Sequence, residues 1–145
     1  MIAVETNILI RAHRRDAETH AAALECMRRL TEGGLPWAIP WPCLHEFIGI
    51  VTHPNIFKPP STLDEVLTQI DVWLGSPWFV FLHETGDHLV HLADVLRASK
   101  AAGPKIHDAK IAAICLAHDV RELWSADRDF SKFPGLHVVN PLVQS

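Results

Sequence analysis

Short apolar runs alternate with longer stretches of helical spacing along this chain of 145 residues. The continuous runs are short enough to be buried strands, and they lie at 2–4, 37–39, 78–82, 123–125 and 137–139. Between them, apolar residues recur every three or four positions, which predicts helices at 16–31, 42–51, 62–74, 89–96 and about 108–119. Strands that alternate with helices predict an α/β domain with a central, mainly parallel sheet of four to five strands and helices on both faces.

Capping signals sharpen three of these helices. Asp16 is a good N-cap for the helix at 16–31, which we expect to turn Leu24, Met27 and Leu30 toward the core. Pro42 suits the first turn of the next helix, and Ser61-Thr62 with Asp64-Glu65 offers a capping box for the third. The apolar run at 78–82 predicts a fully buried parallel strand.

The length suits one compact domain over 1–145, large enough to bury roughly two-thirds of the surface of its unfolded form. Apolar residues make up 48% of the chain and charged residues 21%, and no apolar stretch approaches the roughly 20 residues of a membrane span. The start of the chain lacks the pattern of a secretory signal, and the three cysteines are odd in number and widely spaced. We therefore expect a cytoplasmic protein without a membrane anchor.

Four acidic residues, scattered along the chain, are the candidates for a metal site. Glu5 follows the strand at 2–4 at a strand-to-loop position, and Asp127 follows the strand at 123–125. Ligands of open α/β sheets bind at such strand ends. Asp108 lies near the start of its helix, and Glu46 lies within another. Carboxylates suit Mg²⁺ or Mn²⁺ and phosphate chemistry, and a close group of them would need a cation to relieve its repulsion.

Each acid has a structural explanation when it is taken alone. Asp108 could cap its helix, Glu46 could lie on an exposed helical face, and Asp127 and Asp129 could form a turn. Two short polar side chains at strand ends, Asn7 and Ser125, could hydrogen-bond the acids and hold them in position, although Asn7 could equally cap the first helix.

The net charge of −4 argues against a protein that holds nucleic acid by a broad basic face, but it does not exclude a nuclease with an acidic centre. Among the basic residues near the acids, Arg11 and Arg128 are the plausible phosphate contacts. Their alternative is a solvated surface. His88 and His91 have the spacing of metal ligands, but without a third partner they do not predict a zinc site.

The segments at 2–9, 106–113 and 123–130, together with the helix that carries Glu46, resemble PIN-domain ribonucleases, and most closely VapC-type toxins. The similarity extends over essentially the whole chain, and its most specific part is the segment at 106–141. The resemblance implies a PIN-like three-layer domain that hydrolyses RNA with Mg²⁺ or Mn²⁺. It also implies a cognate VapB-type antitoxin that blocks the acidic site, and a homodimer. Its catalytic acids would be Glu5, Glu46, Asp108 and Asp127, with Glu5, Asp108 and Asp127 as metal ligands and Asn7, Ser125 and Asp129 in support.

One departure from the family pattern is Glu5, because the opening motif of the family has Asp before Thr-Asn. The extra methylene displaces the carboxylate by about 1.5 Å, whereas catalytic groups must be held to about 0.5 Å. We therefore expect weakened metal binding or activity. The alternative is a domain that lacks chemistry and binds RNA or its antitoxin, and a third reading is another metal-dependent phosphoryl hydrolase.

Overall fold

A five-stranded parallel sheet forms the centre of the computed structural model, which describes residues 1–143. The strand order is β3-β2-β1-β4-β5, and every neighbouring pair is parallel, as the alternating pattern predicted. The strands are β1 (Ile2–Val4), β2 (Trp37–Pro40), β3 (Phe79–Leu82), β4 (Glu122–Trp124) and β5 (His137–Val139).

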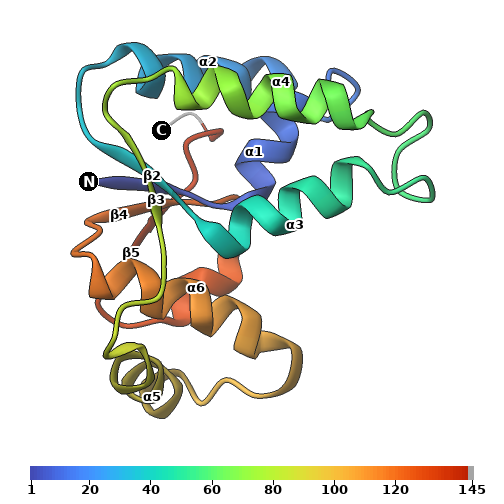
Figure 1. Cartoon of the computed structure of the whole chain (residues 1–145). Coiled ribbons are helices and arrows are strands. Elements are labelled where there is room, and N and C mark those ends of the chain that lie inside the picture. The colour runs from blue at the N-terminus through green and yellow to red at the C-terminus, as the bar shows by residue number, and fades with distance from the viewer. Residues whose placement is uncertain (144–145) are drawn as a thin grey trace.

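Helices cover both faces of the sheet, which confirms the three-layer arrangement (Figure 1). Helices α1, α2 and α4 lie on one side, α6 lies on the other, and α5 packs on the outer surface of α6. Helix α3 leaves the carboxyl end of β2 beside α1. The helices are α1 (Thr6–His13), α2 (His20–Glu32), α3 (Trp41–Val51), α4 (Leu63–Leu74), α5 (His88–Ser99) and α6 (Ile106–Ala117), with short 3-10 turns η1 (Gly103–Lys105) and η2 (Arg128–Lys132).

The order of the strands determines where a ligand can bind. From the central β1, the chain first builds β2 and β3 on one side and then crosses to β4 and β5 on the other. The strand order therefore reverses between β1 and β4, and α/β proteins bind ligands beyond the carboxyl ends of the strands at this point. Glu5 directly follows β1, and Ser125 directly follows β4.

The three helices that carry the acids or lie beside them are anchored by buried apolar residues. Ile8 and Leu9 of α1 have no exposed surface, and Phe47 of α3 is equally buried. In α6 the segment 111–115 is buried on all sides, because the helix lies between the sheet and α5. Packed helices of this kind hold the side chains at their ends on a rigid base.

Two expected helix features are wrong. No loop follows β1, because α1 begins directly after Glu5. Helix α2 begins at His20 and not at Asp16, because the Asp16 carboxylate is bound at both oxygens by Arg14, with the shorter contact at 2.7 Å. That charge-assisted bidentate pair outcompetes a capping bond.

Two expected burials are also wrong. Leu24 is 50% exposed, because its side of α2 faces a groove and not the core. Val80 in β3 is 46% exposed, because β3 is an edge strand with a partner on one side only.

The predicted capping box of α4 is confirmed, with Thr62 and Glu65 each accepting a backbone N–H of the other at 3.1 Å.

Candidate metal centre

Three carboxylates converge beyond the carboxyl ends of β1 and β4. One oxygen from each of Asp108, Asp127 and Asp129 lies within 4.8 Å of the other two, and all three residues are partly buried. Asp108 comes from the first turn of α6, and the other two come from the turn after β4. Oxygen ligands at this separation can hold a hard divalent cation such as Mg²⁺ or Mn²⁺.

Glu5 lies at the N-terminus of α1 and is only 5% exposed. Its carboxylate accepts the Asn7 N–H at 3.2 Å and the Ser125 hydroxyl at 3.3 Å. Burial raises the pKa of Glu5 to about 7, and the negative charge of Glu46 adds to this rise, while the hydrogen bonds oppose it. Without a cation, Glu5 is therefore roughly half protonated near neutral pH.

Asp108 responds to the same group of acids. Burial raises its pKa, the Asp127 carboxylate raises it further, and Glu46 adds a smaller effect in the same direction. The neighbouring Lys105 and His107 oppose the rise. Glu46 thus acts electrostatically on both Glu5 and Asp108, so the four acids predicted from the sequence share one electrostatic environment. The group of three within 4.8 Å nevertheless contains Asp129 and neither Glu5 nor Glu46.

Asn7 and Ser125 join the two strand ends. Ser125 Oγ accepts the Asn7 side-chain N–H at 3.4 Å and the Asp127 backbone N–H at 3.0 Å. Asn7 Oδ1 in turn accepts the Ala126 N–H at 3.0 Å. The network links Glu5 to Asp127 through one hydroxyl, which is how residues behind a metal site hold its ligands in position.

Glu46 lies at the more open side of the centre, with its side chain 33% exposed. His107 Nε2 lies 2.7 Å from Glu46 Oε2, without the alignment of a hydrogen bond. This contact brings the middle of α3 against the start of α6.

The basic residues divide into two groups. Lys105 and Lys132 both pair with Asp129, Lys132 at 3.6 Å. These two lysines therefore neutralise part of the negative charge of Asp129. Arg128 is exposed on η2, directly beside Asp127. Arg11 is held elsewhere, because its guanidinium donates to Thr19 Oγ1 at 2.8 Å, in the loop before α2.

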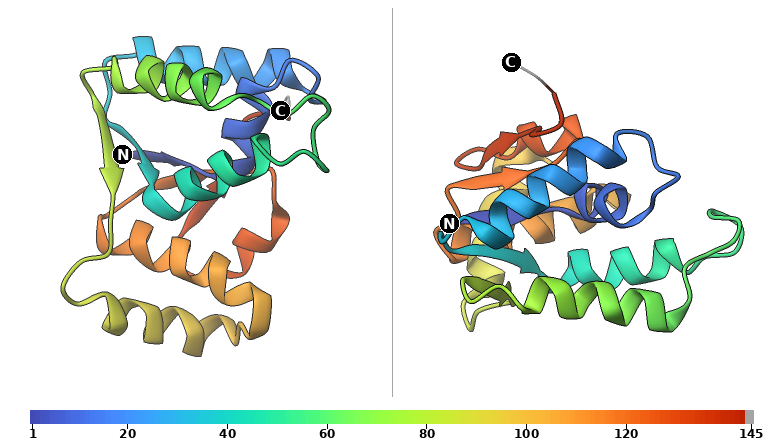
Figure 2. Two further views of the ribbon diagram at one scale, coloured as in Figure 1. Left: turned by 45° about the vertical axis from the view of Figure 1, so that its right-hand side comes forward. Right: turned by 90° about the horizontal axis from the view of Figure 1, so that it is seen from above.

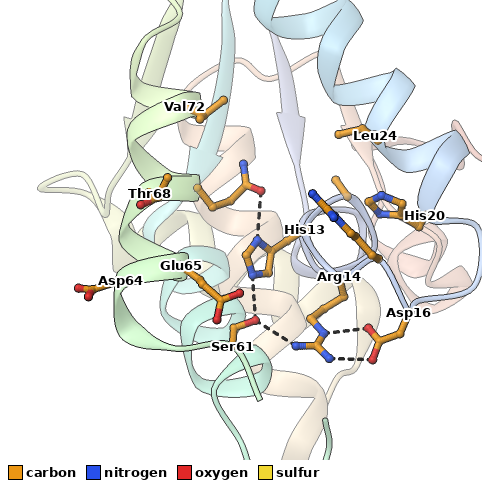
Figure 3. A pocket seen from close by; sticks show the side chains of 13 residues that line it. His13, Arg14, Asp16, His20, Leu24, Ser61, Asp64, Glu65, Thr68 and Val72 are labelled. Atoms are coloured by element: carbon orange, nitrogen blue, oxygen red, sulfur yellow. Dashed lines mark hydrogen bonds and ion pairs between the residues drawn. The ribbon is translucent and has the colours of Figure 1, made fainter. Parts of the chain in front are cut away.

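A groove of about 810 Å³ opens at the far end of α1 (Figure 3). Its two walls are α2 and α4, which lie apart on the same side of the sheet in the view from above (Figure 2). His13 at its floor contacts Gln69 Oε1 at 3.1 Å and Ser61 Oγ at 2.9 Å, and Arg14 reaches the same hydroxyl at 3.2 Å (Figure 3). The apolar spacing of α2 and α4 fits a packed core as well as a groove, because the groove depends on the separation of two helices that are far apart along the chain.

The family model described as "PIN domain" matches residues 2–136. A protein named "VapC ribonuclease Mb2897", from Mycobacterium bovis, is 31% identical over 142 residues, which cover 98% of this chain and 96% of that protein. "Ribonuclease VapC31" from Mycobacterium tuberculosis is 28% identical over 141 residues, covering 97% and 99% of the two chains.

Solved structures share the fold at lower identity. "VapBC2 from Rickettsia felis bound to a DNA fragment from their promoter" superposes with a TM-score of 0.68 at 16% identity, covering 96% of this chain and 98% of that one. The Mycobacterium tuberculosis protein described as "VapC20, Sarcin-Ricin loop cleaving toxin" gives a TM-score of 0.65 at 16% identity, covering 90% and 93%. Within residues 1–143, no helix is long and apolar enough to cross a membrane.

Proposed function

The chain belongs to the PIN-domain family, and we propose that it is a metal-dependent endoribonuclease that acts as the toxin of a toxin–antitoxin pair. The observation that carries this proposal is the convergence of Asp108, Asp127 and Asp129 at the point where the strand order reverses. The named relatives are ribonucleases and match this chain over nearly its whole length.

In this proposal Asp108 and Asp127 hold a divalent cation, Mg²⁺ or Mn²⁺, and Glu5 completes the set from the end of β1. A bound ion of this kind polarises a phosphate oxygen and lowers the pKa of a bound water. Asp129 is a weaker candidate ligand, because its carboxylate already pairs with Lys105 and Lys132, which would compete with a metal ion for it. Glu46 contributes negative charge from the open side of the centre.

The remaining residues position the acids and the RNA. Ser125 and Asn7 hold Glu5 and Asp127 in register through their shared hydrogen bonds. Arg128 is exposed beside Asp127 and suits contact with a phosphate of the substrate. Arg11 has less support for that role, because Thr19 and the Glu18 carbonyl engage its guanidinium.

A second candidate function is a domain of impaired chemistry that binds RNA or its antitoxin. The observation in its favour is Glu5, which the resemblance marks as a longer side chain than the family residue. Glu5 also lies outside the group of three carboxylates and has a pKa of about 7. We infer that Glu5 lowers metal affinity or activity without disturbing the fold. The side chain is almost fully buried, so the fold holds it in one position.

We further propose that a segment of the cognate VapB-type antitoxin fills the groove between α2 and α4. Leu24 and Val72 supply exposed apolar surface there, at 50% and 61% exposure, beside the charged residues of the floor. Helix α1 joins the groove to the acids, because Glu5 caps its start and His13 ends it. Eight residues of helix span ~12 Å, so an extended antitoxin segment can leave the groove and place a basic residue at the carboxylates.

We expect the toxin itself to be a homodimer. Its three cysteines are free, and we expect it to work in the reducing cytoplasm.

Cleavage of a labelled structured RNA tests the proposal directly. The assay compares this chain with Glu5→Asp in Mg²⁺, Mn²⁺ and EDTA, and uses Asp108→Asn to exclude a contaminating nuclease. Cleavage by Glu5→Asp that EDTA and Asp108→Asn abolish supports the ribonuclease, and the rate of the parent chain then measures the effect of Glu5. If neither protein cuts any of several RNAs with either ion, the binding function replaces it. Cleavage of small phosphomonoesters instead of RNA would indicate a phosphatase.

A further inference from the structure

A second pocket, of about 360 Å³, lies beyond the carboxyl ends of β2 and β3. It is separate from the group of three carboxylates and from the groove between α2 and α4. The side chains that give it chemical character are Trp41 and His45 from α3, His83 and Glu84 after β3, and Lys110 from α6. Aromatic rings with one cation and one carboxylate around a small cavity are the composition of a ligand pocket.

Trp41 is the central feature of this pocket. Phe81 stacks on its ring with centroids 4.0 Å apart and an interplanar angle of 19°, which fixes the orientation of the indole. The ring of His45 lies 5.8 Å away at a tilt of 35°. Trp41 nevertheless remains 37% exposed. A rigid, partly exposed aromatic platform of this kind stacks well on an unpaired nucleobase.

Lys110 and Glu84 supply complementary polar groups. Lys110 forms no ion pair with any acid in residues 1–143, so its charge is available to a phosphate. Glu84 lies 3.9 Å from His88 and keeps 57% of its side chain exposed, so it can accept a hydrogen bond from the amino group of a base. The volume is near the lower end of the range for ligand pockets, about 300–1,000 Å³, which suits a single nucleotide.

The pocket adjoins the metal centre along two helices. His107 and Lys110 are three residues apart on one side of α6, and Glu46 directly follows His45 on α3. Glu46 and His107 are in contact at 2.7 Å, so the two helices meet between the pocket and the metal centre. Three residues of helix advance ~4.5 Å, and a stacked strand advances about 3.4 Å per nucleotide. Lys110 lines the pocket and lies on the same helix as Asp108, so a base in the pocket would belong to the same short stretch of RNA as a phosphate at the carboxylates.

We propose that this pocket, centred on Trp41, binds one unpaired base of the RNA substrate next to the cleaved bond and contributes to the selection of the RNA. The proposal rests on the ribonuclease function. It assigns Trp41 the stacking contact and Lys110 the neighbouring phosphate.

The test measures RNA binding by fluorescence anisotropy in the Asp108→Asn chain, which prevents cleavage. Trp41→Ala is compared with Trp78→Ala, because Trp78 is also exposed, at 49%, but precedes β3 at the amino ends of the strands, opposite the pocket. The labelled RNAs carry a single abasic nucleotide at successive positions. We expect Trp41→Ala to raise the Kd about tenfold, Trp41→Phe to restore most of the affinity, and Trp78→Ala to change nothing. One abasic position should weaken binding to the Asp108→Asn chain by a similar factor. In the chain that also carries Trp41→Ala, the same abasic position should have no further effect.

Other results overturn the proposal. These are an unchanged Kd in Trp41→Ala, abasic effects that are equal in both proteins, or a parent that binds none of the RNAs. A change of oligomeric state in Trp41→Ala, measured by light scattering, would instead identify this surface as an interface between subunits. Cleavage by the unmodified chain or by Glu5→Asp, measured separately, keeps the outcomes distinct. If either protein cuts RNA while Trp41 has no effect, only the pocket assignment fails. If neither cuts, the ribonuclease function fails, and the anisotropy data still decide whether the pocket binds RNA.

Discussion

Replacing Glu5 with glutamine should stabilise the metal-free protein at alkaline pH and leave its stability at low pH unchanged. The pKa of Glu5 rises from its ordinary 4.5 to about 7 in the folded protein, chiefly because the side chain is buried. The folded state therefore binds a proton more tightly than the unfolded state does. Stability falls as pH increases from about 4.5 to about 7, and the loss is complete above that range.

The size of this effect follows from the same pKa values. Each pKa unit corresponds to 1.36 kcal/mol, so ionised Glu5 costs roughly 3 kcal/mol of unfolding free energy at pH 8. Glutamine keeps an oxygen that can accept the Asn7 N–H, and it cannot ionise. We expect the free energy of unfolding of Glu5→Gln at pH 8 to exceed that of the unmodified chain by up to about 3 kcal/mol. This corresponds to a gain of roughly 6–12 °C in Tm for a domain of this size.

Urea unfolding in EDTA, followed by circular dichroism from pH 4.5 to 8.5, measures the difference between the two proteins. Glu46→Gln is the matched control, because it makes the same change at a side chain that is 33% exposed and should alter stability much less. Mg²⁺ should then stabilise the parent more than the Glu5→Gln variant at pH 8, because only the parent offers a carboxylate there. A difference between parent and variant that stays constant across the pH range would refute the assignment of the raised pKa to Glu5.

Four further outcomes follow from the contacts. Asp108→Asn should lower Mg²⁺ affinity at least tenfold in titration calorimetry, because it removes a proposed ligand from the group of three; unchanged binding would place the ion elsewhere. Ser125→Ala should reduce RNA cleavage by about 10- to 100-fold, since one hydroxyl joins Glu5 to the Asp127 turn, and full activity would show that the network is dispensable. Thr62→Ala should destabilise the protein by about 1 kcal/mol in urea unfolding, through loss of the capping box, with activity as the control. The thiols of Cys43 and Cys115 are completely buried, and burial raises the pKa of both. They should react with a thiol reagent at the rate of unfolding, and fast labelling of the native protein would contradict this.

The alternating pattern predicted parallel strands, whose carboxyl ends lie at one edge of a sheet, and it therefore placed Glu5 and the Asp127 turn at the same edge. Glu5 and Asp127 each follow a short apolar run, so the prediction required only that both runs be parallel strands. The apolar pattern carries no information on strand order. It therefore could not show that β3 is an edge strand with Val80 exposed, or that β1 and β4 are neighbours.

Other features depended on contacts between side chains. Asp16 has the ordinary signature of an N-cap, but Arg14 binds its carboxylate and the helix starts four residues later. Leu24 fits the helical apolar pattern of α2, and only the distance between α2 and α4 leaves it half exposed at the groove. Asp129 resembles a turn residue in the sequence, and its place among the three carboxylates follows from the course of the chain after β4.

The positions of the acids also show why ionised Glu5 is costly to the fold without a bound cation. Glu5 caps the N-terminus of α1 and Asp108 lies in the first turn of α6, so both face the positive end of a helix dipole. Such an interaction stabilises a carboxylate by about 0.3–1 kcal/mol, which is less than the roughly 3 kcal/mol that burial and like charge impose on Glu5. Lys105 and Lys132 both pair with Asp129. A positive charge beside Glu5 would offset the remaining cost. We propose that a divalent cation supplies this charge in the active toxin and that a basic residue of the antitoxin supplies it in the inhibited one.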